Sequence, residues 1–230
     1  MEKVILTIFT DPMMGLSYEC EPIFDRLKNE YGDGLEIRYV MAGLVRDVND
    51  FMTPEELSYP PEEGILRYCK RLAGIYKSEE AIGGLPINME GFHLFDENHR
   101  SSNPLCIAYE AAKLTDPEKA DDFLKRLRYA TVAETRQTTR EDEILRAARI
   151  AGLDEEAFLR SFHDGSAEAA FQKDLRFTRS LGICSLPSYL LQYGARTMLI
   201  KALIGYDDFV RAIKECGIYH SHFDDIASFH

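Results

Sequence analysis

The first part of this 230-residue chain places one amphipathic segment between two strand-like segments. Val4–Phe9 is a mostly apolar run of strand length, and Leu35–Met41 alternates with a period of two. Between them, Tyr18–Tyr31 has helical spacing, with Pro22 near its start and Gly32 directly after its last residue. A strand, a helix and a strand in this order predict a right-handed βαβ unit with parallel strands.

Strand patterns return near the other end of the chain. Ser188–Tyr193 and Thr197–Ala202 flank a short glycine-containing turn, which predicts a β-hairpin, and Phe209–Cys216 follows as a closing helix. Residues 45–181 carry mostly helical patterns, with candidate capping residues such as Thr53 at their starts. The two strand-forming pieces can share one sheet only if the helical segment leaves that sheet and returns to it.

The order of elements therefore predicts an α/β fold, β-α-β followed by β-β-α, with a large all-helical insertion. We place the α/β domain at residues 1–44 and 182–217, the helical insertion domain at 45–181 and a C-terminal tail at 218–230. No segment repeats another at a fixed period, so the chain is not a repeat protein.

The charge of the chain limits its partners. With 27 lysines and arginines against 39 aspartates and glutamates, the formal net charge is −12. Such a charge repels phosphate backbones and anionic surfaces, so neither nucleic acid nor a membrane is an expected partner. The N-terminus lacks the features of a signal peptide, and no segment reaches the roughly 18 apolar residues that span a bilayer. We expect a cytoplasmic protein, and the sequence indicates no particular oligomeric state.

The cysteines do not form a recognisable redox or metal motif. There are five, an odd number, and no two are separated by two residues as in a CxxC pair. This argues against a secreted disulfide scaffold and against a thiolate zinc site. Cys69, Cys106 and Cys216 lie in apolar helical contexts and are expected to be small buried side chains.

Several short motifs resemble the DsbA family of thioredoxin-fold proteins. In chain order they are Asp11-Pro12, Tyr18, Glu21-Pro22, Gly182-Ile183-Cys184-Ser185-Leu186-Pro187 and Ile204-Gly205-Tyr206. Their order and spacing are most similar to the branch usually labelled predicted protein-disulfide isomerases. The helical segment also matches that family's insertion in length and position. The resemblance covers nearly the whole chain and implies a thioredoxin-like fold with a helical insertion.

The chain departs from this family where the chemistry takes place. Met14 stands at the position of the nucleophilic cysteine and Ser17 at that of the resolving cysteine, so the CxxC motif is lost. Disulfide exchange needs one thiolate to attack and a second thiol to resolve the mixed disulfide. A thioether cannot ionise, and a serine hydroxyl cannot form a disulfide. We therefore expect a redox-inactive protein that binds a peptide or a small thiol in the former active-site cleft.

The resemblance also implies which residues form this cleft. They are Asp11, Pro12, Met14, Gly15, Leu16, Ser17, Tyr18, Leu186 and Pro187. Pro187 matches the family's cis-proline, and the residue before that proline pairs through its backbone with an extended substrate. Such binding needs neither a cysteine nor a cofactor, and Leu186 would make the groove more apolar.

A thiol-handling enzyme is the first alternative. Kappa-type glutathione transferases hold the glutathione thiolate with a serine at the start of this helix, although that serine aligns with Met14 and not with Ser17. Cys20 and Cys184 are the other candidates, since the resemblance allows the two to approach each other. In this interpretation catalysis would be glutathione-dependent or would use a single cysteine, and glutathione would be the cofactor.

A protease adaptor is the second alternative. The SpxH-type adaptors of Gram-positive bacteria are a DsbA-like branch that presents client proteins to a protease. They share the features seen here in Asp11-Pro12 and Glu21-Pro22-Ile23. In this interpretation the partner is a client protein.

Two other polar clusters are explained most simply by solvation. His220 and His222 in the tail, and His93 and His99 around Asp96, have metal-binding side chains, but we predict no metal site. The polar run 136–140 is expected on a solvated helical face.

Overall fold

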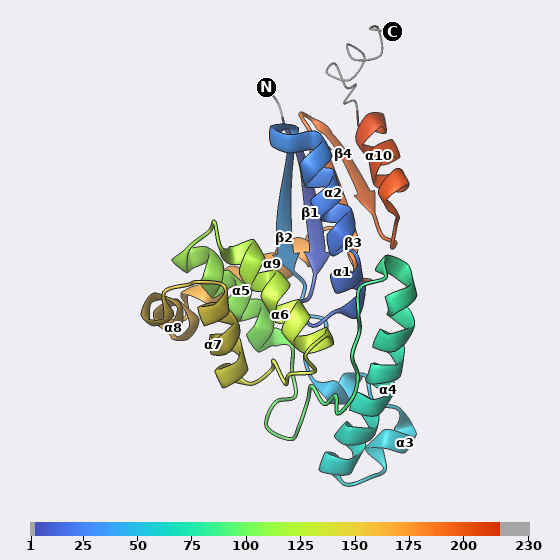
Figure 1. The fold of residues 1–230 in the computed structure, drawn as a ribbon, viewed down its shortest axis with the longest axis vertical. Coiled ribbons are helices and arrows are strands. Elements are labelled where there is room, and N and C mark those ends of the chain that lie inside the picture. Colours follow the sequence, from blue (N-terminus) through green and yellow to red (C-terminus); the bar gives the residue numbers. More distant parts are fainter. Residues whose placement is uncertain (1–2, 217–230) are drawn as a thin grey trace, which may run out of the picture.

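Four strands form one mixed sheet in the order β2-β1-β3-β4 (Figure 1). The computed structural model describes residues 3–216. Its strands are β1 (Val4–Thr10), β2 (Leu35–Met41), β3 (Ser188–Tyr193) and β4 (Arg196–Ile200). β2 is parallel to β1, whereas β3 is antiparallel to both of its neighbours. Ile5 pairs with Gln192, so the two ends of the chain share one sheet, as predicted.

The predicted single helix after β1 is two helices, α1 (Gly15–Glu19) and α2 (Glu21–Tyr31). The prediction was wrong at its start, because the first helix begins at Gly15 and ends before Cys20. Pro22 is the physical reason for the break between α1 and α2, since it has no N–H to donate to the carbonyl of Tyr18 and its ring crowds that carbonyl. The turn between β1 and α1 is short and comprises residues 11–14.

Aromatic side chains pack α2 and α10 (Tyr206–Glu215) against the sheet. The ring centroid of Tyr189 lies 4.8 Å from that of Phe209 and 6.2 Å from that of Phe24, with the rings edge to face. Each such pair adds about 0.5–1.5 kcal/mol beyond the burial of its area. These contacts hold both helices on one face of the sheet.

The segment between β2 and β3 is helical, as predicted. Its helices are α3 (Pro54–Leu57), α4 (Pro61–Gly83), α5 (Asn103–Thr115), α6 (Ala120–Val132), α7 (Glu141–Ile150), α8 (Glu155–His163) and α9 (Ser166–Ser180). Thr53 caps α3 as expected, because its Oγ1 accepts the N–H of Glu56 at 3.2 Å. In Figure 1, α4 lies on one side of α1 and the α5–α8 bundle on the other. Within residues 3–216, no helix is long and apolar enough to cross a membrane.

The expectation for the polar run 136–140 was wrong. α6 ends at Val132 and α7 begins at Glu141, so the run is a connection and not part of a helix. Thr138 and Thr139 are buried. Their hydroxyls are satisfied, since Thr138 Oγ1 lies 2.6 Å from Thr131 Oγ1 and Thr139 Oγ1 donates to the carbonyl of Leu94. Hydrogen bonds of this kind allow polar residues to be buried at little cost.

Helix α9 covers the other face of the sheet, although it lies within the segment predicted as an insertion. The rings of Phe177 and Phe9 are 5.4 Å apart, and Asp174 Oδ2 accepts the N–H of Met41 at 2.7 Å. Asp174 also lies against Glu110 of α5, which is 3% exposed. One helix therefore contacts both the sheet and the helical segment, and the division into domains at residue 181 stays a prediction.

We expect Asp174→Asn to change how the free energy of unfolding depends on pH. Burial and the negative charge of Glu110 raise the pKa of Asp174 from 3.8 to about 7. Between about pH 4 and pH 7 the folded state therefore holds a proton that the unfolded chain has released, and stability falls as pH rises. Asparagine cannot ionise, so the variant should gain roughly 1–2 kcal/mol over the wild type on going from about pH 5 to about pH 8. Urea denaturation at both pH values measures this gain.

Glu62→Gln provides the control, because it removes an exposed carboxyl at the start of α4. The unfolding free energy of this variant should follow that of the wild type at both pH values. An equal gain in the two variants, or no gain in Asp174→Asn, would contradict a proton held at Asp174.

Candidate functional site

The turn between β1 and α1 is built around the buried carboxylate of Asp11. Its Oδ1 accepts the N–H of Met13 at 3.1 Å, and its Oδ2 accepts the N–H of Leu44 at 2.8 Å. Ser102 Oγ, directly before α5, and Cys106 Sγ of α5 donate to the same Oδ2 at 2.6 and 3.4 Å. Burial raises the pKa of Asp11, and these hydrogen bonds oppose that rise by favouring the charged form. Asp11 therefore holds the turn in place from the interior of the protein.

Ser17 faces the interior of the protein. It is 2% exposed, and its Oγ lies 2.7 Å from Thr10 Oγ1, which also accepts a hydrogen bond from Arg128 Nη2 at 3.0 Å. Arg128 is fully buried, and its Nη1 pairs with Glu21 Oε1 at 3.3 Å. Ser17 Oγ also lies 3.9 Å from Met14 Sδ. The hydroxyl is thus part of a buried polar network, where a substrate thiol does not reach it.

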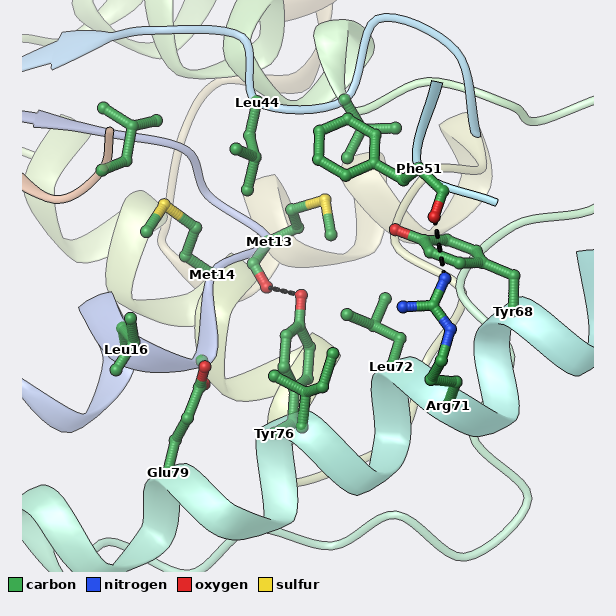
Figure 2. Close-up of a pocket in the computed structure, with 14 residues that line it drawn as sticks. Met13, Met14, Leu16, Leu44, Phe51, Tyr68, Arg71, Leu72, Tyr76 and Glu79 are labelled. Atoms are coloured by element: carbon green, nitrogen blue, oxygen red, sulfur yellow. Dashed lines mark hydrogen bonds between the residues drawn. The ribbon is translucent and has the colours of Figure 1, made fainter. Parts of the chain in front are cut away.

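In front of this network lies a cleft of about 200 Å³ (Figure 2). Its walls come from the start of α1, the segment after β2, one side of α4 and the loop before β3. The lining residues are Met13, Met14, Gly15, Leu16, Leu44, Val45, Phe51, Tyr68, Arg71, Leu72, Ile75, Tyr76, Glu79 and Leu186. Most of these side chains are apolar, and Figure 2 shows Met14, Leu44 and Leu72 directed into the space between the walls.

Helix α4 is fixed against α1 and forms the rigid wall of the cleft. The hydroxyl of Tyr76 donates to the carbonyl of Met13 at 2.6 Å. Further along, the N–H groups of Gly83 and Leu85 donate to Glu19 Oε2 at 2.9 and 3.2 Å. The approach at Gly83 requires glycine, because a Cβ there would lie 2.1 Å from the carbonyl oxygen of Glu19. The cleft is therefore a feature of the fold and does not depend on a mobile lid.

Two charged side chains line the cleft, and they differ in their surroundings. Arg71 is neutralised, because its Nε and Nη2 bind the carboxylate of Glu56 at 2.9 and 3.0 Å. Glu79 points towards the start of α1, where a Cβ on Gly15 would lie 2.2 Å from its Oε2. This oxygen is buried without a hydrogen-bond partner among the described residues. Burial and the nearby carboxylate of Glu19 raise the pKa of Glu79 to about 7.

The peptide bond between Leu186 and Pro187 is cis, as the resemblance implies. Leu186 lines the cleft, and Pro187 is buried behind it. Among residues 3–216, no hydrogen bond uses the backbone N–H or carbonyl of Leu186. These groups are therefore available to a bound chain at the edge of the cleft.

A family model described as thioredoxin matches residues 7–197. The chain belongs to the thioredoxin family. The "putative protein disulfide isomerase" of Nitrosomonas europaea has a TM-score of 0.75 at 17% identity, over 93% of this chain and 97% of that chain. The cytosolic disulfide reductase DsbM of Pseudomonas aeruginosa, solved with GSH, has a TM-score of 0.65 at 20% identity, over 92% and 98%. The fold of this thioredoxin-family chain is thus DsbA-like.

Curated relatives of this thioredoxin-family chain are named ClpXP adapter protein SpxH. That of Shouchella clausii is 28% identical over 185 residues, which are 79% of this chain and 55% of the relative. That of Bacillus cereus strain ATCC 14579 is 25% identical over 211 residues, which are 90% of this chain and 67% of the relative. The chain thus spans about half to two thirds of the length of these relatives.

The residues predicted for the cleft divide into two groups. Met14, Gly15, Leu16 and Leu186 line it. The others lie behind it: Asp11, Pro12, Ser17, Tyr18 and Pro187 are all buried, and the hydroxyl of Tyr18 donates to the carbonyl of Pro86 at 3.4 Å.

The sequence did not reveal the α4 wall of the cleft. Tyr68, Leu72, Tyr76 and Glu79 follow one another at steps of four, four and three residues, which places them on one side of a helix. That spacing was the available signal, with one carboxyl among apolar neighbours. It does not by itself say which other element the helix side faces.

The five cysteines are all free thiols in the structure. Cys69, Cys106 and Cys216 are buried, which confirms the prediction. Cys20 is also buried, and burial raises the pKa of its thiol to about 11. Cys184 is exposed beside a second hollow that shares Leu44 and Leu186 with the cleft. The structure therefore does not join Cys20 to Cys184.

The histidines considered as metal ligands do not form a site in the described part of the chain. Residues 3–216 contain no group of three or more histidine, cysteine or acidic side chains arranged to hold a metal ion. His99 Nδ1 lies 2.9 Å from Asp96 Oδ1 within one loop, and Gln137 Nε2 donates to Asp96 Oδ2 at 2.7 Å. His220 and His222 lie outside the described residues.

We expect a thiol reagent to modify one cysteine in the folded protein. Cys184 is exposed, whereas burial raises the pKa of the other four thiols and shields them from the reagent. Iodoacetamide at neutral pH followed by mass spectrometry should add one adduct per chain, and Cys184→Ser should remove it. In about 6 M guanidinium chloride all five sites should react. Rapid modification of Cys20 in the folded protein would contradict this assignment.

Proposed function

We propose that this chain binds an extended segment of a client protein in the cleft beside Leu186 and does not catalyse dithiol exchange. The observation that carries the proposal is the composition of the cleft at the family's redox position. Met14 presents a thioether there, Ser17 is buried behind it, and none of the described residues that line the cleft is a cysteine. What remains is an apolar recess beside an unpaired stretch of backbone, which suits peptide binding.

The size of the cleft favours a side chain over a small-molecule ligand. Sites for drug-sized ligands usually measure about 300–1,000 Å³. The cleft measures about 200 Å³ and has mostly apolar walls. One apolar side chain of a bound segment can fill it, while the N–H and carbonyl of Leu186 pair with the backbone of that segment. Glutathione, with its two carboxylates, fits the apolar recess less well.

An adaptor role follows as the second part of the proposal, because curated relatives bear the name ClpXP adapter protein. A module that holds a client without altering its thiols suits delivery to a protease, and we propose that it acts in the cytoplasm. Single-cysteine chemistry stays the alternative, and the exposure of Cys184 is the observation that favours it.

Restoring both cysteines should restore redox chemistry. The wild type should reduce insulin no faster than the background with dithiothreitol, because Met14 and Ser17 supply no thiolate. The double variant Met14→Cys with Ser17→Cys should accelerate the reduction at least about tenfold, since both new thiols would lie at the start of α1, where a thiolate is stabilised. Turnover by the wild type would overturn the redox-inactive assignment.

Peptide binding can be tested with a matched pair of variants on α4. Ile75 lines the cleft and Ile82 does not, yet the two are 43% and 45% exposed on the same helix. A capped Gly-Ser-Leu-Ser-Gly peptide, followed by NMR titration, should bind Ile75→Asn about fivefold more weakly than wild type, a loss of about 1 kcal/mol of apolar contact. Ile82→Asn should bind as the wild type does. Equal effects of the two substitutions, or no binding of the peptide by the wild type, would contradict the proposal.

A further inference from the structure

One carboxyl group that lines the cleft, that of Glu79, has no cationic partner among the described residues. Its Oε2 is buried and makes no close hydrogen bond within residues 3–216, although the backbone N–H of Leu16 lies near enough to favour the charged form. The other charged group of the cleft, Arg71, is bound to Glu56 and also donates to the carbonyl of Phe51 at 2.8 Å. Lys77, on the same helix as Glu79, binds the carbonyl of Ile87 and the carboxylate of Glu80 instead. The cleft is therefore apolar at its centre and acidic at one end.

We propose that the client segment carries a lysine or arginine next to the apolar side chain that fills the cleft, and that Glu79 binds this cation. The inference rests on the proposed function and names the chemistry of its partner. Ionising a carboxyl group in a low-dielectric wall is costly, and a cation brought by the ligand offsets that cost. The chain as a whole has a net charge of −12, so it attracts basic segments and repels acidic ones.

The arrangement around Glu79 positions its carboxylate for this role. Gly15 leaves room for the carboxylate at the start of α1, because a Cβ at this position would lie 2.2 Å from Oε2 and displace it. Figure 2 shows Glu79 rising from α4 between Leu16 and Tyr76, towards the same space as Met14. Arg71 is two turns away on the helix, roughly 12 Å along its axis, so it does not compete for the carboxylate. An apolar residue at the centre and its basic neighbour can therefore contact the cleft and Glu79 together.

The groups that face Glu79 determine whether the affinity for a basic peptide rises or falls with pH. Burial raises the pKa of Glu79 to about 7, the carboxylate of Glu19 on α1 adds to the rise, and the backbone N–H of Leu16 opposes it. Tyr76, on its own helix, and Cys20, after α1, are also near, and both have raised pKa values and stay neutral at pH 7. A bound cation favours the ionised form of Glu79. Affinity for a basic peptide should therefore increase as pH rises through about 7.

Three capped peptides, identical except for one residue after a central leucine, test the inference. The sequences are Gly-Ser-Leu-Lys-Ser-Gly, Gly-Ser-Leu-Gln-Ser-Gly and Gly-Ser-Leu-Glu-Ser-Gly, measured by isothermal titration calorimetry at low salt. At about pH 8 the lysine peptide should bind about tenfold more tightly than the glutamine peptide, and the difference should shrink at about pH 5.5. Glu79→Gln should remove both the preference and its pH dependence. Glu62→Gln, an exposed site on the same helix, should keep both.

Charge reversal keeps the test decisive if Glu79→Gln proves unstable. Glu79→Lys should prefer the glutamate peptide over the lysine peptide, which a loss of structure would not produce. If all three peptides bind the wild type equally well, the role of Glu79 is wrong while peptide binding stands. If none of them binds, the proposed function itself fails and the inference fails with it.

Discussion

The buried carboxylate of Asp11 is the interaction on which the site depends. It lies directly after β1 and accepts hydrogen bonds from the turn at Met13, from Leu44 after β2 and from Ser102 before α5. Three segments that are distant in the sequence therefore meet at one group. Each of them supplies a wall of the cleft or supports one, and removing an acceptor with several buried donors costs about 1–3 kcal/mol for each donor left unpaired.

The loss of the redox pair fits the surroundings of Ser17. In the interior, a hydroxyl can both donate and accept, and Ser17 is joined through Thr10 to Arg128 and Glu21. Arg128 comes from α6 in the helical segment and is fully buried, so its charge requires these partners. The network now holds the β1–α1 turn and the helical segment together. A structural role has taken the place where the family keeps a reactive thiol, while Met14 keeps the front of the site apolar.

The sequence was sufficient for the fold and for the front edge of the site. Periodicity and turn residues predicted β1, β2 and the hairpin of β3 and β4, and the motif around Pro187 implied the cis bond that the structure contains. The sequence was insufficient for the wall of the cleft that α4 forms. A helical pattern gives the spacing of Leu72, Tyr76 and Glu79 but not the element that they face. The sequence also misjudged the run 136–140, since polar residues are buried when tertiary contacts satisfy their hydrogen bonds.

Helix α4 is the element through which, under the proposed function, this fold would serve recognition in place of thiol chemistry. It is tied to α1 by Tyr76 and Glu19, so any side chain on its cleft side is presented at a defined place relative to Met14 and Leu186. Under the proposed function, specificity would depend on Tyr68, Leu72, Ile75 and Glu79, which line the cleft from this helix. In such a cleft, the carboxylate of Glu79 would select the bound segment by its charge, and the apolar centre of the cleft would select it by its shape. Under the proposed function, the helical insertion would set which segment binds, while the thioredoxin-like part would supply the backbone to which it binds.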